Sequence, residues 1–84
     1  MTMYMAEDTP LARINTAACL RLGLRAAAGH DGPADFVEAH KWLNIAAIAG
    51  DEKAERYRSE LALHMSKDEL ARALRAARQW MTLH

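Results

Sequence analysis

Cysteine is nearly absent from this 84-residue chain, in which Cys19 is the single example. One cysteine excludes an intramolecular disulfide and a zinc site built from several cysteines, so a reducing cytoplasm is the expected location. The longest apolar run falls far short of the ~20 residues that a membrane-spanning helix needs. The N-terminus lacks the basic region of a secretory signal, and Glu7 and Asp8 place acidic charge early instead.

The chain also lacks an excess of charge of either sign, because 11 Lys and Arg residues balance 11 Asp and Glu residues. A nucleic-acid-binding domain of this size usually has a marked basic excess, so the balance argues against that class. Glycine and proline are scarce, with four and two copies, and they fall where helices are expected to stop. Valine and isoleucine are rare as well, whereas alanine occurs 18 times and leucine 10 times. This composition predicts a single all-α domain.

The N-terminal third is expected to form a flexible tail followed by one long helix. Residues 1–8 are assigned to the tail, and residues 9–84 to a single helical domain. Thr9 is expected to cap a helix that starts at Pro10, where proline costs least, and that continues to Ala28. Its apolar residues fall on two faces, which predicts neighbours on more than one side.

Local signals place three further helices after the glycine-rich loop at residues 29–35. Asp35 and Ser66 each precede a glutamate by three positions, which predicts capping boxes at the starts of the second and fourth helices. Gly50 is expected to end the second helix, and Asp51 to cap the third at once. Four helices with short connections predict two antiparallel helix hairpins stacked as a short α/α superhelix.

The last two helices each show an apolar stripe at helical spacing. In the third helix the expected buried stripe is Ala54, Tyr57, Leu61 and Met65. Its charged residues, Arg58 among them, are expected to face solvent. In the fourth helix the expected buried residues are Leu70, Ala73, Leu74, Ala77 and Met81.

Trp42 is conspicuous because it lies in a run of small residues. Alanines allow two helices to approach closely, and the space left where the helices diverge needs one large side chain. We therefore interpret Trp42 as a structural residue between helices, whose replacement by alanine should cost about 3–5 kcal/mol.

Residues 16–51 resemble the Sel1-like repeat, a relative of the tetratricopeptide repeat. The matching positions, in continuous register, are Leu22-Gly23, Gly29, Pro33, Asp35, Ala39, Lys41-Trp42, Ala46-Ala47 and Gly50. Residues 51–82 fit poorly and resemble a degenerate capping repeat. The resemblance implies a right-handed α/α superhelix that acts as a protein-interaction adaptor, with no catalytic residue, cofactor or metal. The expected structural core is Leu22, Gly23, Ala39, Trp42, Ala46, Ala47, Gly50, Tyr57, Leu61 and Leu74.

Two groups of arginines are the candidates for partner contact. Arg72, Arg75 and Arg78 follow one another along the last helix. They suit an acidic partner or phosphate groups, although the net charge of zero favours the interpretation as a solvated helix surface. Arg13, Arg21 and Arg25 give the first helix a basic character. The resemblance implies that this helix lines the concave surface, which makes its arginines the better candidates.

Other functional readings have weaker support in the sequence. His30 beside Asp31 and Asp35 is the best metal candidate, but the histidines lack the spacing of paired ligands. Cys19, among apolar neighbours and with no nearby histidine, is expected to be a small buried hydrophobe. The alternative function is a helical DNA-binding domain that uses the arginine-bearing last helix.

Self-association is a further expectation, because a repeat usually needs neighbours to cover its apolar faces. The outer face of the first helix, formed by Leu11, Ile14 and Ala18, has no preceding repeat to cover it. Either the apolar tail at residues 3–5 folds over this face, or a second copy covers it in a homodimer.

Overall fold

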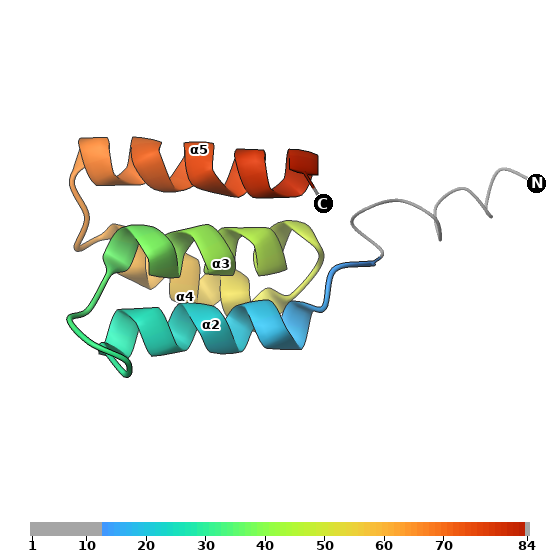
Figure 1. Ribbon diagram of the computed structural model, residues 1–84, viewed down its shortest axis with the longest axis horizontal. Helices are drawn as coiled ribbons and strands as arrows, with labels where there is room; N and C mark the ends of the chain where they lie inside the picture. Colours follow the sequence, from blue (N-terminus) through green and yellow to red (C-terminus); the bar gives the residue numbers. More distant parts are fainter. Residues whose placement is uncertain (1–12, 84) are drawn as a thin grey trace, which may run out of the picture.

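The computed structural model describes residues 13–83 and contains four α-helices in that part of the chain (Figure 1). They are α2 (Thr16–Ala28), α3 (Phe36–Ile48), α4 (Glu52–Ala62) and α5 (Lys67–Leu83). The structure confirms the all-α fold class. The expected tail at residues 1–8 lies outside the described residues.

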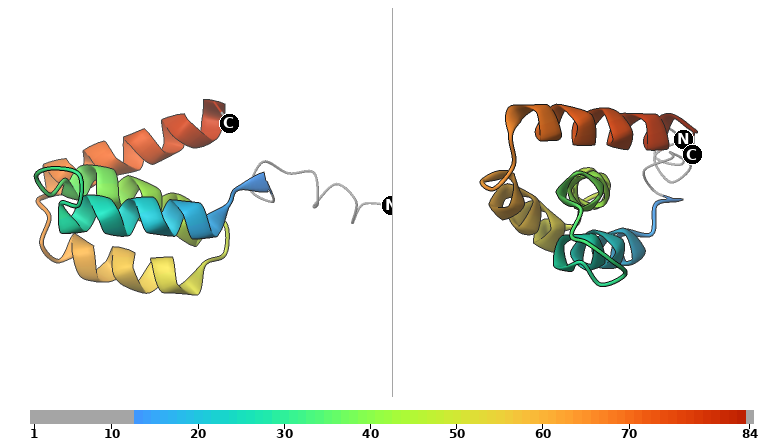
Figure 2. Two further views of the ribbon diagram at one scale, coloured as in Figure 1. Left: turned by 60° about the horizontal axis from the view of Figure 1, so that its bottom comes forward. Right: turned by 60° about the vertical axis from the view of Figure 1, so that its left-hand side comes forward.

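Helix α3 lies at the centre of the fold, because each of the other three helices packs against it. In Figure 1, α3 lies between α5 and α2, with α4 behind. Figure 2 shows α5 on the opposite side of α3 from α2. Consecutive helices are antiparallel, so α2 and α4 run in one direction and α3 and α5 in the other. Because the other helices pack around α3, all four described helices contribute to one shared core.

The first described helix starts later than the sequence analysis predicted. The expected start at Thr9 and Pro10 lies outside the described residues; within them residues 14 and 15 are not helical, and the α-helix begins at Thr16 with Asn15 as its N-cap. The side chain of Asn15 accepts a hydrogen bond of 3.0 Å from the backbone N–H of Ala18. An asparagine that satisfies an otherwise unpaired N–H group is a strong local start signal, and the prediction overlooked it.

Two glycines end helices as the prediction requires. Gly50 has φ 110°, a conformation that favours glycine because it has no Cβ. Its N–H donates to the carbonyl of Ala47, and that of Asp51 to the carbonyl of Ala46, both at 3.0 Å. This pair of hydrogen bonds forms a Schellman motif. Gly29, with φ 70°, ends α2 in the same way.

The predicted caps lie at the starts of α3, α4 and α5. Asp35 accepts from the N–H of Glu38 at 3.0 Å, and Asp51 from that of Ala54 at 3.1 Å. Ser66 and Glu69 form the complete capping box, with reciprocal bonds of 2.8 and 3.1 Å. At Asp35 only half of the box forms, because its own N–H donates to the carbonyl of Ala26.

Removing either confirmed cap is expected to destabilise the fold. Asp35→Ala and Ser66→Ala should each lower the free energy of unfolding by about 0.5–2 kcal/mol, because each leaves a helix N–H group without its acceptor. Urea denaturation followed by circular dichroism measures the change. Ser59→Ala is the matched control, since Ser59 is exposed in the middle of α4 and bonds only the Glu55 carbonyl in the described structure. Unchanged midpoints for both cap variants would contradict the helix starts.

The core is built where α2 crosses α3 closely. Gly23 is buried, and a Cβ added to it would lie 2.8 Å from Cγ of Leu43 and 3.2 Å from the carbonyl oxygen of Ala39. Ala39 and Ala46 are fully buried, Leu61 is nearly so, and Ala47 is half-buried. The small residues therefore lie where the helices approach one another, as the Trp42 interpretation requires.

Four residues expected in the structural core are exposed, and this part of the prediction is wrong: three large side chains and Gly50, which lies in the turn after α3. Leu22, Tyr57 and Leu74 expose 44%, 43% and 44% of their surface. Each lies about 100° around its helix from a residue that faces α3, so it falls at the edge of the contact. Periodicity identified the correct side of each helix but made the buried stripe too wide.

The prediction also misplaced two residues of the third helix. Met65 lies in the turn after α4, which ends at Ala62, although Met65 still packs against the core. Arg58 was expected on the solvent side, yet it lies on the stripe that faces α3 and is half-buried. Its guanidinium donates a hydrogen bond of 2.6 Å to the side-chain carbonyl of Asn44 on α3.

Two polar side chains on α3 are buried, and the sequence analysis did not single them out. His40 is 4% exposed and Asn44 is 6% exposed. The side-chain carbonyl of Asn44 accepts from Arg58, whereas Nδ1 of His40 has no hydrogen-bond partner among residues 13–83. Burial lowers the pKa of His40 below its ordinary value, and the positive charge of Arg58 lowers the pKa further.

The lowered pKa of His40 predicts that stability falls as the solution becomes acidic. Below about pH 6.5 the unfolded chain binds a proton at this histidine more readily than the folded chain does. Proton binding therefore stabilises the unfolded state and lowers the free energy of unfolding. The urea midpoint should therefore be lower at pH 5.5 than at pH 7.5. His40→Gln should reduce this difference, while His30→Gln, at an exposed loop position, should leave it unchanged. An equal pH dependence in both variants would show that His40 is not responsible.

Trp42 is half-buried at the edge of the core and contacts α5. Its ring meets that of Trp80 edge to face, with 5.4 Å between centroids and an interplanar angle of 73°. The indole N–H donates a bond of 2.8 Å to the carboxylate of Glu38, and Nζ of Lys41 lies 4.2 Å from the ring centroid. Trp42 thus joins α3 to α5.

Candidate protein-interaction groove

Two shallow hollows lie between α2 and α4, one at the start of α4 and one near its end, and Leu43 of α3 lines the second. We call this surface the α2–α4 groove. Its residues are Ala17, Leu20, Arg21, Leu24 and Ala27 from α2, Leu43 from α3, Asp51 to Lys53, Arg56, Tyr57, Glu60 and Leu61 from α4, and His64.

Three cations lie at the end of the groove where α4 begins. Arg21 comes from α2, and Lys53 and Arg56 come from α4. All three are exposed, and none forms an ion pair with another residue between 13 and 83. The acids at this end are Asp51, whose carboxylate caps α4, and Glu52. Cations without partners are available to an anionic group.

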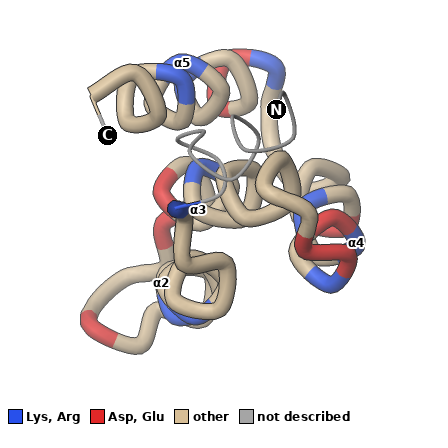
Figure 3. The backbone as a smooth tube through the Cα atoms, turned by 90° about the vertical axis from the view of Figure 1, so that its right-hand side faces the viewer, with Lys and Arg blue, Asp and Glu red and all other residues tan. Residues whose placement is uncertain are grey.

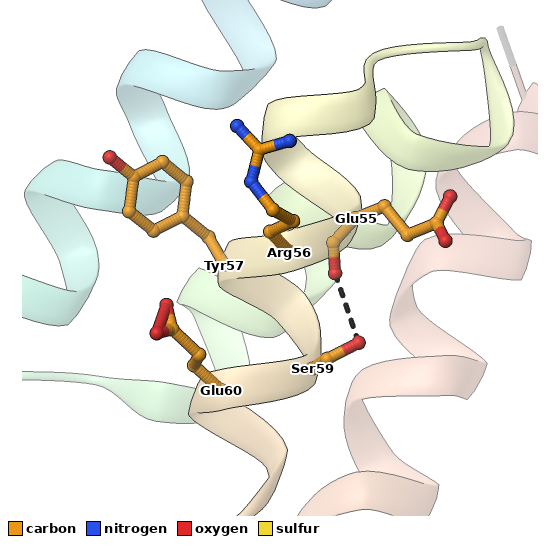
Figure 4. Close-up of a pocket in the computed structure, with 5 residues that line it drawn as sticks. All are labelled: Glu55, Arg56, Tyr57, Ser59 and Glu60. Atoms are coloured by element: carbon orange, nitrogen blue, oxygen red, sulfur yellow. Dashed lines mark hydrogen bonds between the residues drawn. The ribbon is translucent and has the colours of Figure 1, made fainter.

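The other end of the groove is lined by apolar side chains and by Tyr57. The floor is Leu43, which is only 1% exposed, and Leu24 and Leu61 form the walls. Figure 4 shows Tyr57 pointing from α4 toward α2, whereas Glu55 points toward α5. A half-exposed aromatic ring beside leucines offers an apolar contact surface to a partner. Glu60 and His64 lie at this end as well.

The helix directions give the groove an electrostatic polarity. Because α2 and α4 run in the same direction, both N-termini lie at the end that holds Arg21, Lys53 and Arg56. Helix N-termini carry partial positive charge and C-termini partial negative charge. The cations therefore add to the helix dipoles at one end, and Glu60 adds to them at the other.

The remaining arginines predicted to contact a partner are not brought together with Arg21. Arg25 is paired with Asp31 in the loop that follows α2, at 2.9 Å. Arg13 lies before α2, at the start of the described residues, and is exposed. Arg25 lies one turn after Arg21 on α2 but is held by Asp31, and only Arg21 lines the groove.

The arginines of α5 lie on a different surface. Figure 3 shows α5 separated from α2 by α3. Arg72 is paired with Asp68 at 3.0 Å, whereas Arg75 and Arg78 are exposed and form no ion pair within the described chain. No residue of α5 lines the α2–α4 groove. The fold thus presents two separate basic surfaces.

The candidate thiol and the candidate metal ligands have structural roles in the fold. Cys19 is 5% exposed in the core, and burial raises the pKa of its thiol, which disfavours the reactive thiolate. Asp31 is engaged by Arg25, and Asp35 caps α3. Within residues 13–83, no group of three His, Cys, Asp or Glu side chains could hold a metal ion. None of the helices described here is both long enough and apolar enough to cross a bilayer.

Sequence reasoning missed two members of the groove, Lys53 and Arg56. Both were assigned to the solvent-facing side of the third helix, as mixed charges on a helix usually are. Only the placement of α4 beside α2 brings them near Arg21. The available signal was the basic i, i+3 pair, Lys53 and Arg56, next to Tyr57.

Comparisons with protein-family models, with curated proteins and with solved structures found no match. The resemblance to Sel1-like repeats therefore stays a prediction that rests on residues 16–51.

Proposed function

We propose that this chain is a small protein-interaction module of the Sel1-like repeat type, which binds a partner protein in the α2–α4 groove and performs no catalysis. The observation that carries the proposal is the groove itself, where Tyr57 is 43% exposed beside cations that form no ion pair with another described residue. We place this role in the cytoplasm, where the free thiol of Cys19 stays reduced.

Site-specific crosslinking tests whether the groove contacts a partner. A photoreactive phenylalanine analogue replaces Tyr57 in one variant and Arg75, on α5, in a matched control. Crosslinking in cells of the source organism is expected to give a discrete adduct at position 57, which weakens when Arg56→Glu is added. An adduct at position 75 alone would place the partner on α5 instead.

The alternative function, DNA binding by α5, makes a different prediction. Arg75 and Arg78 are exposed on this helix, and they are the observation that favours it. A duplex-binding surface would lose affinity steeply between 50 and 200 mM salt, because phosphate contacts release counterions. Fluorescence anisotropy with labelled duplex DNA at both salt concentrations distinguishes the two functions.

A homodimer through the N-terminal helix also stays a prediction. Ile14 and Ala18 are half-buried and Leu22 is exposed, whereas Leu11 lies outside the described residues. Light scattering of the full chain at micromolar concentration measures the mass. A monomer mass that persists after deletion of residues 1–8 would exclude both the dimer and a covering tail.

A further inference from the structure

The charges along the α2–α4 groove specify more than a site for an unspecified protein. Cations from two helices lie at one end, leucines and Tyr57 follow, and Glu60 lies at the far end. A partner that binds the whole length must present charges in the opposite order. Complementarity of this kind sets which partner binds and in which direction.

We propose that the α2–α4 groove binds a short peptide segment of another protein whose charges follow one order along the groove. The segment carries an acidic residue at the Arg21–Arg56 end, an apolar side chain against Tyr57, and a basic residue near Glu60. This inference rests on the proposed function and adds the chemistry of the bound segment and the order of its charges.

The acidic residue is assigned by the cations and by the helix ends together. Arg21 and Arg56 belong to different helices, so one carboxylate between them contacts both walls of the groove. Lys53 lies one turn before Arg56 and extends the same positive region. The N-termini of α2 and α4 lie at this end and favour negative charge as well.

The apolar position is assigned by the exposed ring of Tyr57. Its neighbours in the groove are Leu24 and Leu61, with Leu43 beneath. An aliphatic or aromatic side chain of the segment would cover this surface and remove it from water. An acidic chain that is attracted only by the cations needs no contact with Tyr57. Dependence of binding on Tyr57 therefore distinguishes a specific peptide from nonspecific electrostatic binding.

The length of the groove sets the spacing of the charges in the segment. Arg56 and Glu60 are four residues apart on α4, which corresponds to about 6 Å along the helix axis. An extended peptide covers that distance in about two residues. A helical segment covers it in about four residues, or one turn. The acidic and basic residues should therefore be about two or four positions apart.

Selection from a random 12-residue peptide display library tests the proposal with the full chain as bait. Enriched peptides are expected to share the order acidic, apolar, basic, or its reverse in sequence if the segment binds in the opposite chain direction. Binding of a labelled enriched peptide is then measured by fluorescence polarisation. Arg21→Glu/Arg56→Glu should weaken it about tenfold or more, and Tyr57→Ala comparably.

Matched variants separate a local effect from one of net charge. Arg75→Glu/Arg78→Glu changes the net charge equally, but on α5, and should leave the affinity within about twofold. A peptide whose acidic residue is replaced by lysine should bind the Arg21→Glu/Arg56→Glu chain better than it binds the original chain. Circular dichroism confirms that each variant is folded, as expected for exposed positions.

The outcomes distinguish the failure of the proposed peptide chemistry from the failure of the proposed protein-binding function. Enriched peptides that depend on Tyr57 but show no acidic preference, or that bind Arg21→Glu/Arg56→Glu equally well, would overturn this inference and leave the proposed function standing. A selection that yields no peptide sensitive to substitution of Tyr57, Arg21 or Arg56 would overturn both. Peptides that lose binding only with Arg75→Glu/Arg78→Glu would do the same and move the site to α5.

Discussion

Replacing Trp42 with alanine is expected to lower the free energy of unfolding by about 3 kcal/mol, at the lower end of the range for large buried aromatics. The lower end applies because Trp42 is half-buried at the edge of the core. The substitution removes the ring contact with Trp80 and leaves the Glu38 carboxylate without its indole donor. A domain of this size has a total stability of about 4–13 kcal/mol, so the loss is a large fraction.

Two further variants divide the Trp42 effect into its parts. Trp42→Phe keeps an aromatic ring against Trp80 but removes the indole N–H, and should cost about 1 kcal/mol. Trp80→Ala, combined with Trp42→Ala in a double-mutant cycle, should show a coupling of about 0.5–1.5 kcal/mol for an edge-to-face pair. Urea denaturation measures all of them. A Trp42→Ala midpoint equal to that of the unmodified chain would contradict the structural role.

Gly23→Leu is the second substitution with a large expected effect, a loss of about 3 kcal/mol. Even a single Cβ at this position would lie 2.8 Å from Cγ of Leu43, and 3.2 Å from the backbone carbonyl of Ala39. Leu43 is 1% exposed and has little room to move, so α2 must shift away from α3. Overpacking of this kind typically costs about 1–3 kcal/mol, and a leucine lies at the upper end.

The smaller substitution Gly23→Ala distinguishes the effect of packing from that of helix propensity, because the two change the free energy of unfolding in opposite directions. Alanine normally stabilises a helix relative to glycine by about 1 kcal/mol. Ala17→Gly, at an exposed position of the same helix, measures that term directly. Gly23→Ala should nevertheless destabilise the fold, because the close contact outweighs the propensity. A Gly23→Ala chain that is more stable than the original would show that α2 and α3 do not approach as described.

Much of the fold could be predicted because helix ends are coded locally. Asp35, Asp51 and Ser66 act through hydrogen bonds within one turn, and Gly50 through its own backbone conformation. A sequence window of a few residues contains all of these interactions. The start of α2 was misplaced for the same reason, since Asn15 and Thr9 are both good local caps and nothing nearby chooses between them.

The groove was less predictable because it depends on how the helices pack. Periodicity shows that one side of α4 is apolar, but not how wide the covered stripe is. Tyr57 was therefore assigned to the core, and Arg58 to the surface, where the structure has the reverse. The proximity of Arg21 to Arg56 arises only when α4 is placed beside α2 on α3.

Chemical-shift mapping tests the proposed groove most directly. The ¹⁵N-labelled chain is titrated with an enriched peptide, and the backbone amide shifts are followed for every helix. We expect the largest changes to cluster on the facing sides of α2 and α4, around Arg21, Leu24, Arg56 and Tyr57, while α5 changes little. Changes centred on Arg75 and Arg78, with α2 and α4 unaffected, would contradict it.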